Sequence, residues 1–363
     1  MAMVYELIER NKHFTSIGMC FGHKCTKVFL SIAIIFILTF IIITISNLSN
    51  LHTPCKYIPL TKFNYTLEVL QKVNLMNTKD KQTCQTICKQ LKIPQNRRKA
   101  SQKTNIISHH LIGGSWMFKD NRKSVNSGDL CNSYPKSGVA ILFVCNNRWK
   151  QLNKVLPNLI SILQKQHLCY RIFVIEQEET QLINKAMLMN IGFIEAMKLF
   201  HFNCIIFHDT DLNPLNDRIP YGCDEQTALT PVHLGVALDT RNFTLLYDTL
   251  IGGVLKISIE HFLTVNGYSN SYWGWGQEDD DMEIRLKTAG IQCIHADESI
   301  ARYQVIPHSR QSQSMVSEHV KLLKTAVCRM PYDGLTSLNY HIRSIKYKAY
   351  FTHILVSIGS YTG

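Results

Sequence analysis

The longest apolar stretch of the chain runs from Val28 to Ile45 and reads VFLSIAIIFILTFIIITI. Only three polar residues interrupt it, and no charged residue occurs between Lys27 and Lys56. An apolar helix of about 20 residues matches the roughly 30 Å hydrocarbon core of a bilayer. A cleaved signal peptide would have a shorter apolar core and a small-residue cleavage site, and no clear one follows here. The pattern therefore predicts a transmembrane signal anchor at residues 28–46.

The charges that flank this segment predict its orientation. Basic residues, among them Lys12, Lys24 and Lys27, precede it, whereas its far side carries no charge before Lys56. Positively charged flanks stay on the cytoplasmic side of a membrane. We therefore expect a cytoplasmic tail at residues 1–27 and a lumenal or extracellular remainder, which is a single-pass type II arrangement.

A second pattern begins near residue 138, where apolar strand-like runs alternate with stretches of helical spacing. The strand-like runs occupy residues 138–145, 170–177 and 204–214, and the helical stretches occupy 151–166 and a strongly amphipathic 183–200. This alternation is typical of an α/β domain with a parallel sheet, which binds ligands beyond the carboxyl ends of its strands. We assign residues 106–363 to this domain and the polar residues 47–105 to a stem.

Charge and cysteine content change this picture little. The net charge is +12, and eight basic residues between Lys79 and Lys103 face one acid, Asp80. Such a run can bind nucleic acid, but a lumenal location argues for no nucleic-acid partner and favours a solvated stem or attraction to acidic glycans and membranes. Twelve cysteines fit an oxidising compartment. Three glycosylation sequences become candidate sites in that compartment, at Asn47, Asn64 and Asn242.

Two acids and one histidine are candidate metal ligands. Asp209 and Asp211 end the third strand-like run in FHDTDLNP. Two carboxylates separated by one residue can hold a divalent cation and orient a nucleotide diphosphate on it. Acids at strand ends are also common in ordinary turns, so this motif alone is a weak indication. His308, in VIPHSRQ, gains a function only if the fold brings it to Asp211, because lone histidines are usually structural or surface residues.

The most specific motif is WGWGQEDDD at residues 273–281. Its glycines allow the backbone to approach a ligand closely, and its indole rings can stack on sugars. Four adjacent carboxylates would repel one another in an ordinary surface turn. The following DMEIRLKTAG reads as a helix, so the acids could instead form a solvated helix start. That alternative accounts for the acids and leaves the Trp-Gly alternation unexplained.

These motifs, in this order, resemble the β-1,4-galactosyltransferase family. The likeness rests on FHDTDLNP, IGGVLKISIEHFLTVNGYSNSYWGWG, WGWGQEDDD and DGLTSLNYHI, and it runs from about Val139 to the C-terminus. The resemblance implies a GT-A type fold, with a Rossmann-like domain for a nucleotide sugar, behind a type II anchor in the Golgi membrane. It also implies that a sugar moves from a UDP donor to an acceptor sugar with inversion of its anomeric carbon.

The resemblance assigns a role to each motif. Asp279 matches the catalytic base, and Asp211 and His308 match the ligands of a divalent cation, typically Mn²⁺. The donor-binding positions are matched by Arg148, Asn184, Lys185, Asp209, Leu250, Gly253 and Trp275, with Gly252 nearby. The acceptor-binding positions are matched by Tyr247, Glu278, Asp279 and Asp280. Cys204 and Cys223 match a disulfide, and Cys131 matches the start of another, with Cys84 or Cys88 as its partner.

The chain departs from the family pattern at several positions. Val305 stands where galactosyl members have a methionine ligand, so water or Tyr303 could fill that place. The nucleotide segment at residues 144–148 keeps only its last two family residues. Lys185 replaces an arginine and lacks its planar fork, and Gln277 replaces a glycine.

Leu250 is the departure that bears on the donor. Galactosyl members have a tyrosine at this position, whose bulk and hydroxyl disfavour an N-acetyl group on the donor sugar. An aliphatic residue marks members that transfer GalNAc. We therefore expect this chain to accept UDP-GalNAc at least as well as UDP-Gal.

The leading interpretation is a metal-dependent enzyme that transfers GalNAc or Gal in β-1,4 linkage to a terminal GlcNAc of glycoproteins or glycolipids. A xylose-directed galactosyltransferase of proteoglycan synthesis is an alternative within the same class. A catalytically silent relative that acts as a Golgi scaffold is an alternative from a different class, because Val305 and the altered nucleotide segment allow it. The sequence leaves the oligomeric state and the acceptor aglycone open.

Overall fold

A computed structural model of the chain describes residues 115–116, 138–166, 168–179, 182–199, 202–224, 227, 229–308 and 315–361. The expected tail, signal anchor and stem, at residues 1–27, 28–46 and 47–105, lie outside these residues. So do the candidate glycosylation sites Asn47 and Asn64 and the cysteines Cys84, Cys88 and Cys131. Within the described part, no helix is both long enough and apolar enough to cross a bilayer.

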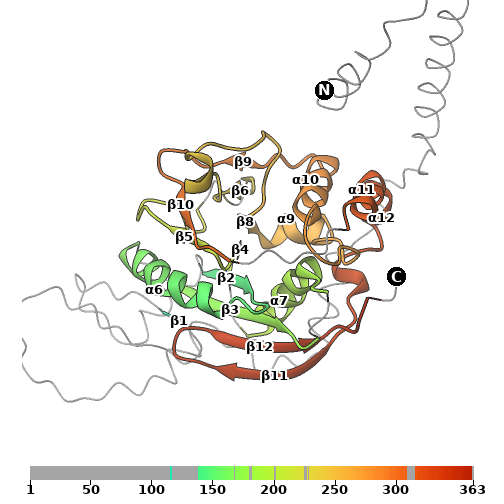
Figure 1. Ribbon diagram of the computed structural model, residues 1–363, viewed down its shortest axis with the longest axis horizontal. Helices are drawn as coiled ribbons and strands as arrows, with labels where there is room; N and C mark the ends of the chain where they lie inside the picture. The colour runs from blue at the N-terminus through green and yellow to red at the C-terminus, as the bar shows by residue number, and fades with distance from the viewer. Residues whose placement is uncertain are drawn as a thin grey trace, which may run out of the picture. The chain divides into compact units, whose positions relative to one another are not determined.

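The described strands form one large sheet and one small sheet (Figure 1). The large sheet has the order β11-β12-β3-β2-β4-β8-β6-β9, with β1 paired to β3. Its strands are β1 (Ser115–Trp116), β2 (Val139–Val144), β3 (Tyr170–Gln177), β4 (Cys204–His208), β6 (Val232–His233), β8 (Val254–Ser258), β9 (Ile294–His295), β11 (His341–Tyr347) and β12 (Thr352–Ser357). The small sheet consists of β5 (Leu212–Pro214), β10 (Arg302–Val305) and β7 (Ala237–Leu238).

The helices connect and cover these sheets. They are α6 (Trp149–Lys165), α7 (Lys185–Leu199), α9 (Ile259–Thr264), α10 (Glu278–Thr288), α11 (Val316–Lys324) and α12 (Ala326–Arg329), with short 3-10 turns η4 (Asp239–Arg241) and η5 (Leu335–Ser337). The predicted order of strand, helix, strand, helix, strand is confirmed by β2, α6, β3, α7 and β4. The expectation of a single third strand over residues 204–214 is wrong, because a turn separates β4 from β5.

The sheet is parallel only in part. Strands β12, β3, β2 and β4 are parallel, as predicted, but β8 is antiparallel to both β4 and β6, and β11 is antiparallel to β12. A parallel neighbour needs a long crossover, usually a helix. Between β4 and β8 the described residues form short strands and turns, so the chain returns alongside β4 in the opposite direction. The prediction of a parallel sheet is therefore confirmed for β2, β3 and β4, on which it was based, and does not hold for β8 and β11.

The central strands are buried on both faces. Val139, Ile141 and Phe143 of β2 pack with α6, whereas Ala140 and Leu142 pack with α7. Successive side chains of a strand point to opposite faces, so α6 and α7 cover opposite sides of the sheet. The chain goes from β2 to β3 on one side and returns past β2 to β4 on the other. Such a reversal is where open α/β sheets bind ligands, at the carboxyl ends of the strands.

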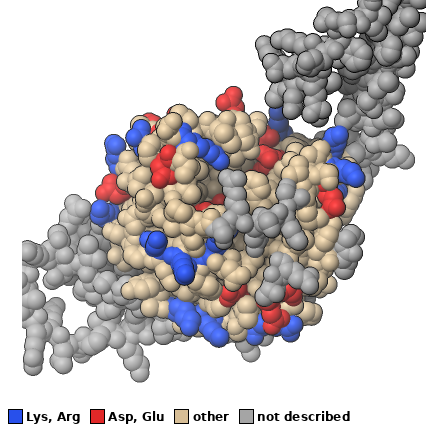
Figure 2. Space-filling view, in the orientation of Figure 1, with Lys and Arg blue, Asp and Glu red and all other residues tan. Residues whose placement is uncertain are grey.

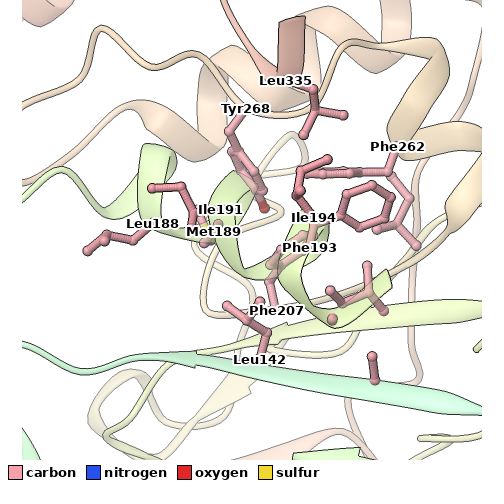
Figure 3. Close-up of a cluster of buried hydrophobic side chains, with 14 of the residues drawn as sticks. Leu142, Leu188, Met189, Ile191, Phe193, Ile194, Phe207, Phe262, Tyr268 and Leu335 are labelled. Carbon is pink, nitrogen blue, oxygen red and sulfur yellow. The ribbon is translucent and has the colours of Figure 1, made fainter. Parts of the chain in front are cut away.

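Helix α7 is buried on all sides, so the prediction that it is amphipathic is wrong. Every residue from Ala186 to Ala196 is buried. Figure 3 shows the reason, since the helix lies between the sheet residue Leu142 and the aromatic rings of Phe262 and Tyr268. A helix that is apolar on every face belongs in a core. Gly192 allows the close approach, because a Cβ there would lie 2.1 Å from Leu142 Cδ1.

Candidate active site

The ammonium group of Lys185 lies among three carboxylates from two distant parts of the chain. Its Nζ lies 3.1 Å from Asp209 Oδ1, 3.0 Å from Glu278 Oε1 and 3.5 Å from Asp279 Oδ2. Burial lowers the pKa of Lys185, but the three negative charges raise it by more, so the group stays protonated. The strand-end motif and the Trp-Gly motif lie far apart in the sequence. In the fold, acids of both motifs therefore meet at the ammonium group of Lys185.

Asn184 fixes the first turn of α7 and thereby the position of Lys185. It is fully buried, and its Oδ1 accepts a hydrogen bond from the backbone N–H of Met187 at 2.9 Å, which is an N-cap contact. Its Nδ2 donates to the carbonyl of Asn270 at 2.7 Å, and its backbone N–H donates to Gln177 Oε1 at 3.1 Å. These contacts give Asn184 a positioning role, and its contact with the donor stays a prediction.

The four acids of the Trp-Gly motif form the first turn of α10, but water does not solvate them freely. Glu278 is buried and shares Lys185 with Asp279. The hydroxyl of Tyr247 donates to Asp280 Oδ1 at 2.9 Å, so the structure joins these two predicted acceptor residues. A helix N-terminus also favours negative charge. The shared ammonium group of Lys185 and the hydroxyl of Tyr247 thus relieve the repulsion that the sequence suggested.

Asp281 faces away from the other acids into a buried ionic network. It is fully buried, and its carboxylate lies 2.5 Å from Arg285 Nε and 2.8 Å from Arg329 Nη2. The hydroxyl of Tyr272 donates to the same carboxylate at 3.0 Å. Arg329 lies in α12, so this network fastens α10, and with it the three other acids, to a helix far along the chain.

The carboxylate of Asp279 lies against Gly252 and is largely shielded from water. Its side chain is 21% exposed, and a Cβ on Gly252 would lie 2.5 Å from Asp279 Oδ2. Burial raises the pKa of Asp279 to about 7, an effect that Lys185 opposes and that Glu278 and Asp209 reinforce. A base with a pKa near the working pH is well matched to proton abstraction.

Asp211 and His308 meet, as the metal-site prediction requires. Asp211 Oδ2 lies 2.8 Å from His308 Nε2, and both side chains are partly exposed. Asp209 instead faces Lys185, and no group of three or more His, Cys, Asp or Glu side chains in the described part forms a metal cluster. A carboxylate oxygen and an imidazole nitrogen suit Mn²⁺. Two protein ligands also leave positions for phosphate oxygens and water, so the donor set fits a cation that binds with a nucleotide.

The strand register explains how the two ligands meet and which residue stands beside them. Strands β5 and β10 are antiparallel, with Val305 opposite Leu212, one residue after Asp211. Val305 is thus near the pair but offers no ligand atom. Tyr303 is fully buried, and its hydroxyl lies 3.0 Å from that of Tyr221. This placement argues against Tyr303 as the third ligand and leaves water as the remaining alternative.

The other predicted donor residues lie at the ends of neighbouring elements. Arg148 is the N-cap of α6, four residues after the last residue of β2. Gly253 has a φ of 87°, and its carbonyl accepts a hydrogen bond from the backbone N–H of Asp209 at 2.8 Å. Leu250 is half-buried two residues before Gly252. Trp275 is 77% exposed, between glycines with positive φ values. Their contact with a donor stays a prediction.

Two features near the site concern covalent modification. The predicted disulfide between Cys204 and Cys223 is confirmed, and it links β4 to the segment after Tyr221. Asn242 is exposed at the end of η4, so a glycan could reach it, and its glycosylation stays a prediction.

On the face shown in Figure 2, the Lys and Arg side chains of the described residues form several separate groups.

Two family models match the chain. One, the N-terminal region of glycosyl transferase group 7, matches residues 114–224, and the other, the N-terminal domain of galactosyltransferase, matches residues 232–309. Together they cover more than half of the chain and include Lys185, Asp211, Asp279 and His308. The chain belongs to the β-1,4-galactosyltransferase family.

Curated members of this family are similar over the same part. β-1,4-Galactosyltransferase 5 of Sus scrofa is 38% identical over 247 residues, which are 68% of this chain and 59% of that protein. β-1,4-Galactosyltransferase 1 of Mus musculus is 39% identical over 223 residues, which are 61% of this chain and 55% of that protein. The chain therefore matches less than two thirds of the length of these family members.

A solved family structure confirms the fold. The catalytic domain of Drosophila β-1,4-galactosyltransferase 7, in complex with xylobiose, is 27% identical with a TM-score of 0.54, and the likeness covers 62% of this chain and 95% of that one. A mutant of the same enzyme, solved with manganese, UDP-Gal and xylobiose, has a TM-score of 0.52 at 26% identity. The predicted GT-A type fold is thus confirmed for the described domain.

Several residues that build the site escaped the sequence reasoning. Arg329 binds Asp281 from a helix 48 residues away, and no local pattern marks it. Arg285 could have been found, because a lysine or arginine four residues after an acid on a helix indicates an ion pair. His233 and His295, which contact the segment before Gly253, also went unnoticed. They come from strands of two residues each, too short to give a pattern.

Proposed function

We propose that this chain transfers Gal or GalNAc from a UDP-sugar, in β-1,4 linkage and with inversion, to a terminal GlcNAc of a glycan. One observation carries the proposal. Lys185 joins the strand-end acid Asp209 to the Trp-Gly acid Asp279 in a single ion-pair cluster. In a family whose members are galactosyltransferases, this cluster brings the predicted donor motif and the predicted base to one place.

Asp279 is suited to act as the general base. Inversion requires that a base removes the proton of the acceptor hydroxyl as that hydroxyl attacks the anomeric carbon. The raised pKa of Asp279, about 7 because of burial, makes its carboxylate a stronger proton acceptor than an ordinary aspartate. Gly252 leaves the carboxylate room to approach the donor segment. Asp280, held by Tyr247, and Glu278 then bind the hydroxyls of the acceptor sugar.

Asp211 and His308 would hold a divalent cation, for which Mn²⁺ is the best candidate. The solved Drosophila family member binds manganese together with UDP-Gal, and the Asp211–His308 contact of 2.8 Å supplies a fitting donor pair here. When bound, such a cation stabilises the negative charge that develops on the departing UDP. The residues of this chain then orient the sugar, exclude water and take up the proton.

Leu250 supports GalNAc as a donor sugar alongside Gal. It lies between Asp248 and Gly252, in the segment whose last residue contacts Asp279. An aliphatic side chain leaves space for an N-acetyl group and offers no hydroxyl in its place. The chain would act in the Golgi lumen, behind a type II anchor at residues 28–46, and would carry a glycan at Asn242.

A donor-by-acceptor assay tests the proposal. The purified full chain is incubated with UDP-Gal or UDP-GalNAc and with a GlcNAc-terminated or a xyloside acceptor, with and without Mn²⁺. We expect transfer to GlcNAc that requires the cation, with UDP-GalNAc used at least as well as UDP-Gal. Transfer to xylose alone would favour the xylose-directed alternative, for which the xylobiose complex of the Drosophila relative is a reason. Absence of transfer under every condition would favour a silent scaffold.

A further inference from the structure

Two histidines from neighbouring strands lie in contact beside the donor segment. His233 of β6 and His295 of β9 are direct partners in the parallel register of these strands. Their Nδ1 atoms are 3.0 Å apart, and the rings meet edge to face at 77°. His233 is fully buried, and His295 is half-buried. None of the roles assigned above uses this pair.

The far side of each ring faces a backbone carbonyl. His233 Nε2 lies 2.8 Å from the oxygen of Gly252, and His295 Nε2 lies 2.8 Å from the oxygen of Asp248. A carbonyl oxygen only accepts hydrogen bonds, so both Nε2 atoms must carry a proton. The contact between the two Nδ1 atoms needs a third proton, shared between them. Two neutral imidazoles carry only two protons, so three complete contacts require one positive charge on the pair.

We propose that His233 and His295 form a singly protonated clamp that positions the donor segment 248–252. This inference rests on the proposed function, because the segment carries Leu250 and ends at Gly252, which touches Asp279. The clamp binds the carbonyls of the first and last residues of that segment. Neither histidine contacts the reacting atoms, so both are positioning residues, and they act through the backbone.

The surroundings decide which ring holds the charge. The pKa of His233 is lowered to about 4, mainly by burial, with smaller contributions from His295 and Arg241 and against the hydrogen bond to Gly252. His233 is therefore the ring that stays neutral when the pair carries one positive charge. The other titratable groups on adjoining elements are Asp239, Asp248, Asp297, Glu298, Glu283, Lys256 and Cys293.

Three of these neighbouring groups have partners or surroundings of their own. The carboxylate of Glu298 accepts a hydrogen bond from the backbone N–H of Leu245, in the loop that leads to the clamped segment. Lys256 is turned to the carbonyls of Pro220 and Gly222. Burial raises the pKa of the Cys293 thiol to about 12, so this group stays neutral.

The clamp responds to pH in one direction across the neutral range. When the pair loses its extra proton as pH rises, one of its three contacts loses its hydrogen and the donor segment loosens. Stabilisation by the clamp is thus present in mild acid and lost with rising pH. A histidine pair is suited to this response, because the ordinary imidazole pKa lies near 6.5.

Two substitutions of His295 in the full chain test the clamp. His295→Arg supplies a permanent positive charge with several donors, whereas His295→Leu removes both. His341→Gln, an exposed histidine of β11, is the control. The dissociation constant of the UDP-sugar is measured with Mn²⁺ at pH 6 and pH 8, and each variant is compared with the wild type at the same pH. Effects of pH on the cation or the nucleotide then cancel.

We expect His295→Arg to match the wild type at pH 6 and to bind the donor about fivefold more tightly than the wild type at pH 8. His295→Leu should bind about fivefold more weakly than the wild type at pH 6 and by a smaller factor at pH 8, where the wild type keeps only the contact of His295 with Asp248. His341→Gln should match the wild type throughout. Equal pH dependence in the wild type and His295→Arg would overturn the clamp.

Thermal unfolding without any ligand separates this inference from the proposed function. The clamp predicts that the midpoint of unfolding of His295→Arg exceeds that of the wild type at pH 8 and equals it at pH 6. This comparison needs no donor, so it decides the clamp even if the chain binds no UDP-sugar. If the unfolding midpoints are as expected but the chain binds no donor, only the proposed function is contradicted. If the midpoint of His295→Arg differs from that of the wild type by the same amount at pH 6 and pH 8, the clamp is overturned.

Discussion

The Nζ of Lys185 lies 3.5 Å from Oδ2 of Asp279, and this ion pair controls the basicity of the site. Burial raises the pKa of Asp279 to about 7, and Lys185 is the main group that opposes the rise. Lys185 also neutralises Asp209 and Glu278, which would otherwise repel Asp279. One lysine thus makes three neighbouring carboxylates compatible with a folded site and limits the strength of the base.

Replacement of Lys185 by methionine should shift the pH dependence of the reaction. Without the positive charge, the pKa of Asp279 rises further, so the base is protonated at a higher pH. We expect the acid limb of kcat/KM to move up by about one pH unit and the activity at pH 7 to fall about fivefold. Lys185→Arg keeps the charge and should keep most of the profile.

Lys198→Met is the matched control for this shift. Lys198 lies in the same helix, and its Nζ is 2.6 Å from Glu195 Oε1, so an ion pair is also lost. Its substitution should leave the pH profile of kcat/KM unchanged. If Lys185→Met and Lys198→Met gave the same profile, the titration would not belong to Asp279.

Substitutions at His308 and at Val305, the last residue of β10, should change the Mn²⁺ requirement in opposite directions. His308→Ala removes one of the two protein ligands and should raise the Mn²⁺ concentration for half-maximal activity at least about tenfold. Val305→Met places a thioether opposite Leu212, next to Asp211, and should lower that concentration. A manganese titration of the three proteins measures both effects. Equal requirements in wild type and His308→Ala would exclude this pair as the cation site.

Leu250→Tyr tests the basis of donor choice. A tyrosine at this position adds bulk and a hydroxyl where an N-acetyl group would otherwise fit. We expect kcat/KM for UDP-GalNAc to fall at least about tenfold, while that for UDP-Gal changes by less than about threefold. Leu246→Tyr, at an exposed leucine of the same loop, should leave the ratio of the two donors unchanged. A constant ratio in Leu250→Tyr would show that another residue selects the donor.

Arg329 should matter for stability more than any exposed arginine. Its guanidinium lies 2.8 Å from the fully buried Asp281 and is itself 14% exposed. Arg329→Met leaves that carboxylate short of a partner, which costs about 3 kcal/mol of unfolding free energy by the usual penalty for a broken buried pair. Arg343→Met breaks an exposed pair with Glu178 and should cost less than about 1 kcal/mol. Denaturant unfolding of both variants makes the comparison, and equal losses would contradict a structural role for Asp281.

Local patterns predicted the elements that carry the donor motif. The strand at 170–177 and the helices at 151–166 and 183–200 emerge close to their observed bounds, because the first helix has regular apolar spacing and the strand and the second helix are largely apolar runs. The spacing of apolar residues could not predict that β8 is antiparallel, because the direction of a strand depends on the connection that leads to it and not on its own residues. Two-residue strands such as β6 and β9 carry no pattern at all.

Those residues of the candidate site that belong to a recognisable sequence motif could be predicted. The resemblance identified Asp211 and His308, and the fold brings them together. The separate environments of Glu278, Asp280 and Asp281 could not be read from a run of like residues, because each depends on a partner from another element. The same limit hid the histidine clamp, whose two members lie 62 residues apart.

Asp279→Asn tests the central claim most directly, because an amide keeps the shape of the side chain and cannot accept the proton. The raised pKa of Asp279 means that the folded chain loses stability as pH rises from about 4 through about 7. The amide removes this loss, so the unfolding midpoint at pH 8 should rise by about 3–5 °C. This gain identifies a folded variant before its activity is measured.

The decisive measurement is kcat of this folded variant at pH 8 with saturating UDP-sugar, GlcNAc acceptor and Mn²⁺. We predict that kcat falls at least about 100-fold while the dissociation constant of the donor changes by less than about threefold. Turnover within a few-fold of the wild type, in a variant that is folded and binds its donor, would contradict the role of Asp279 as the base.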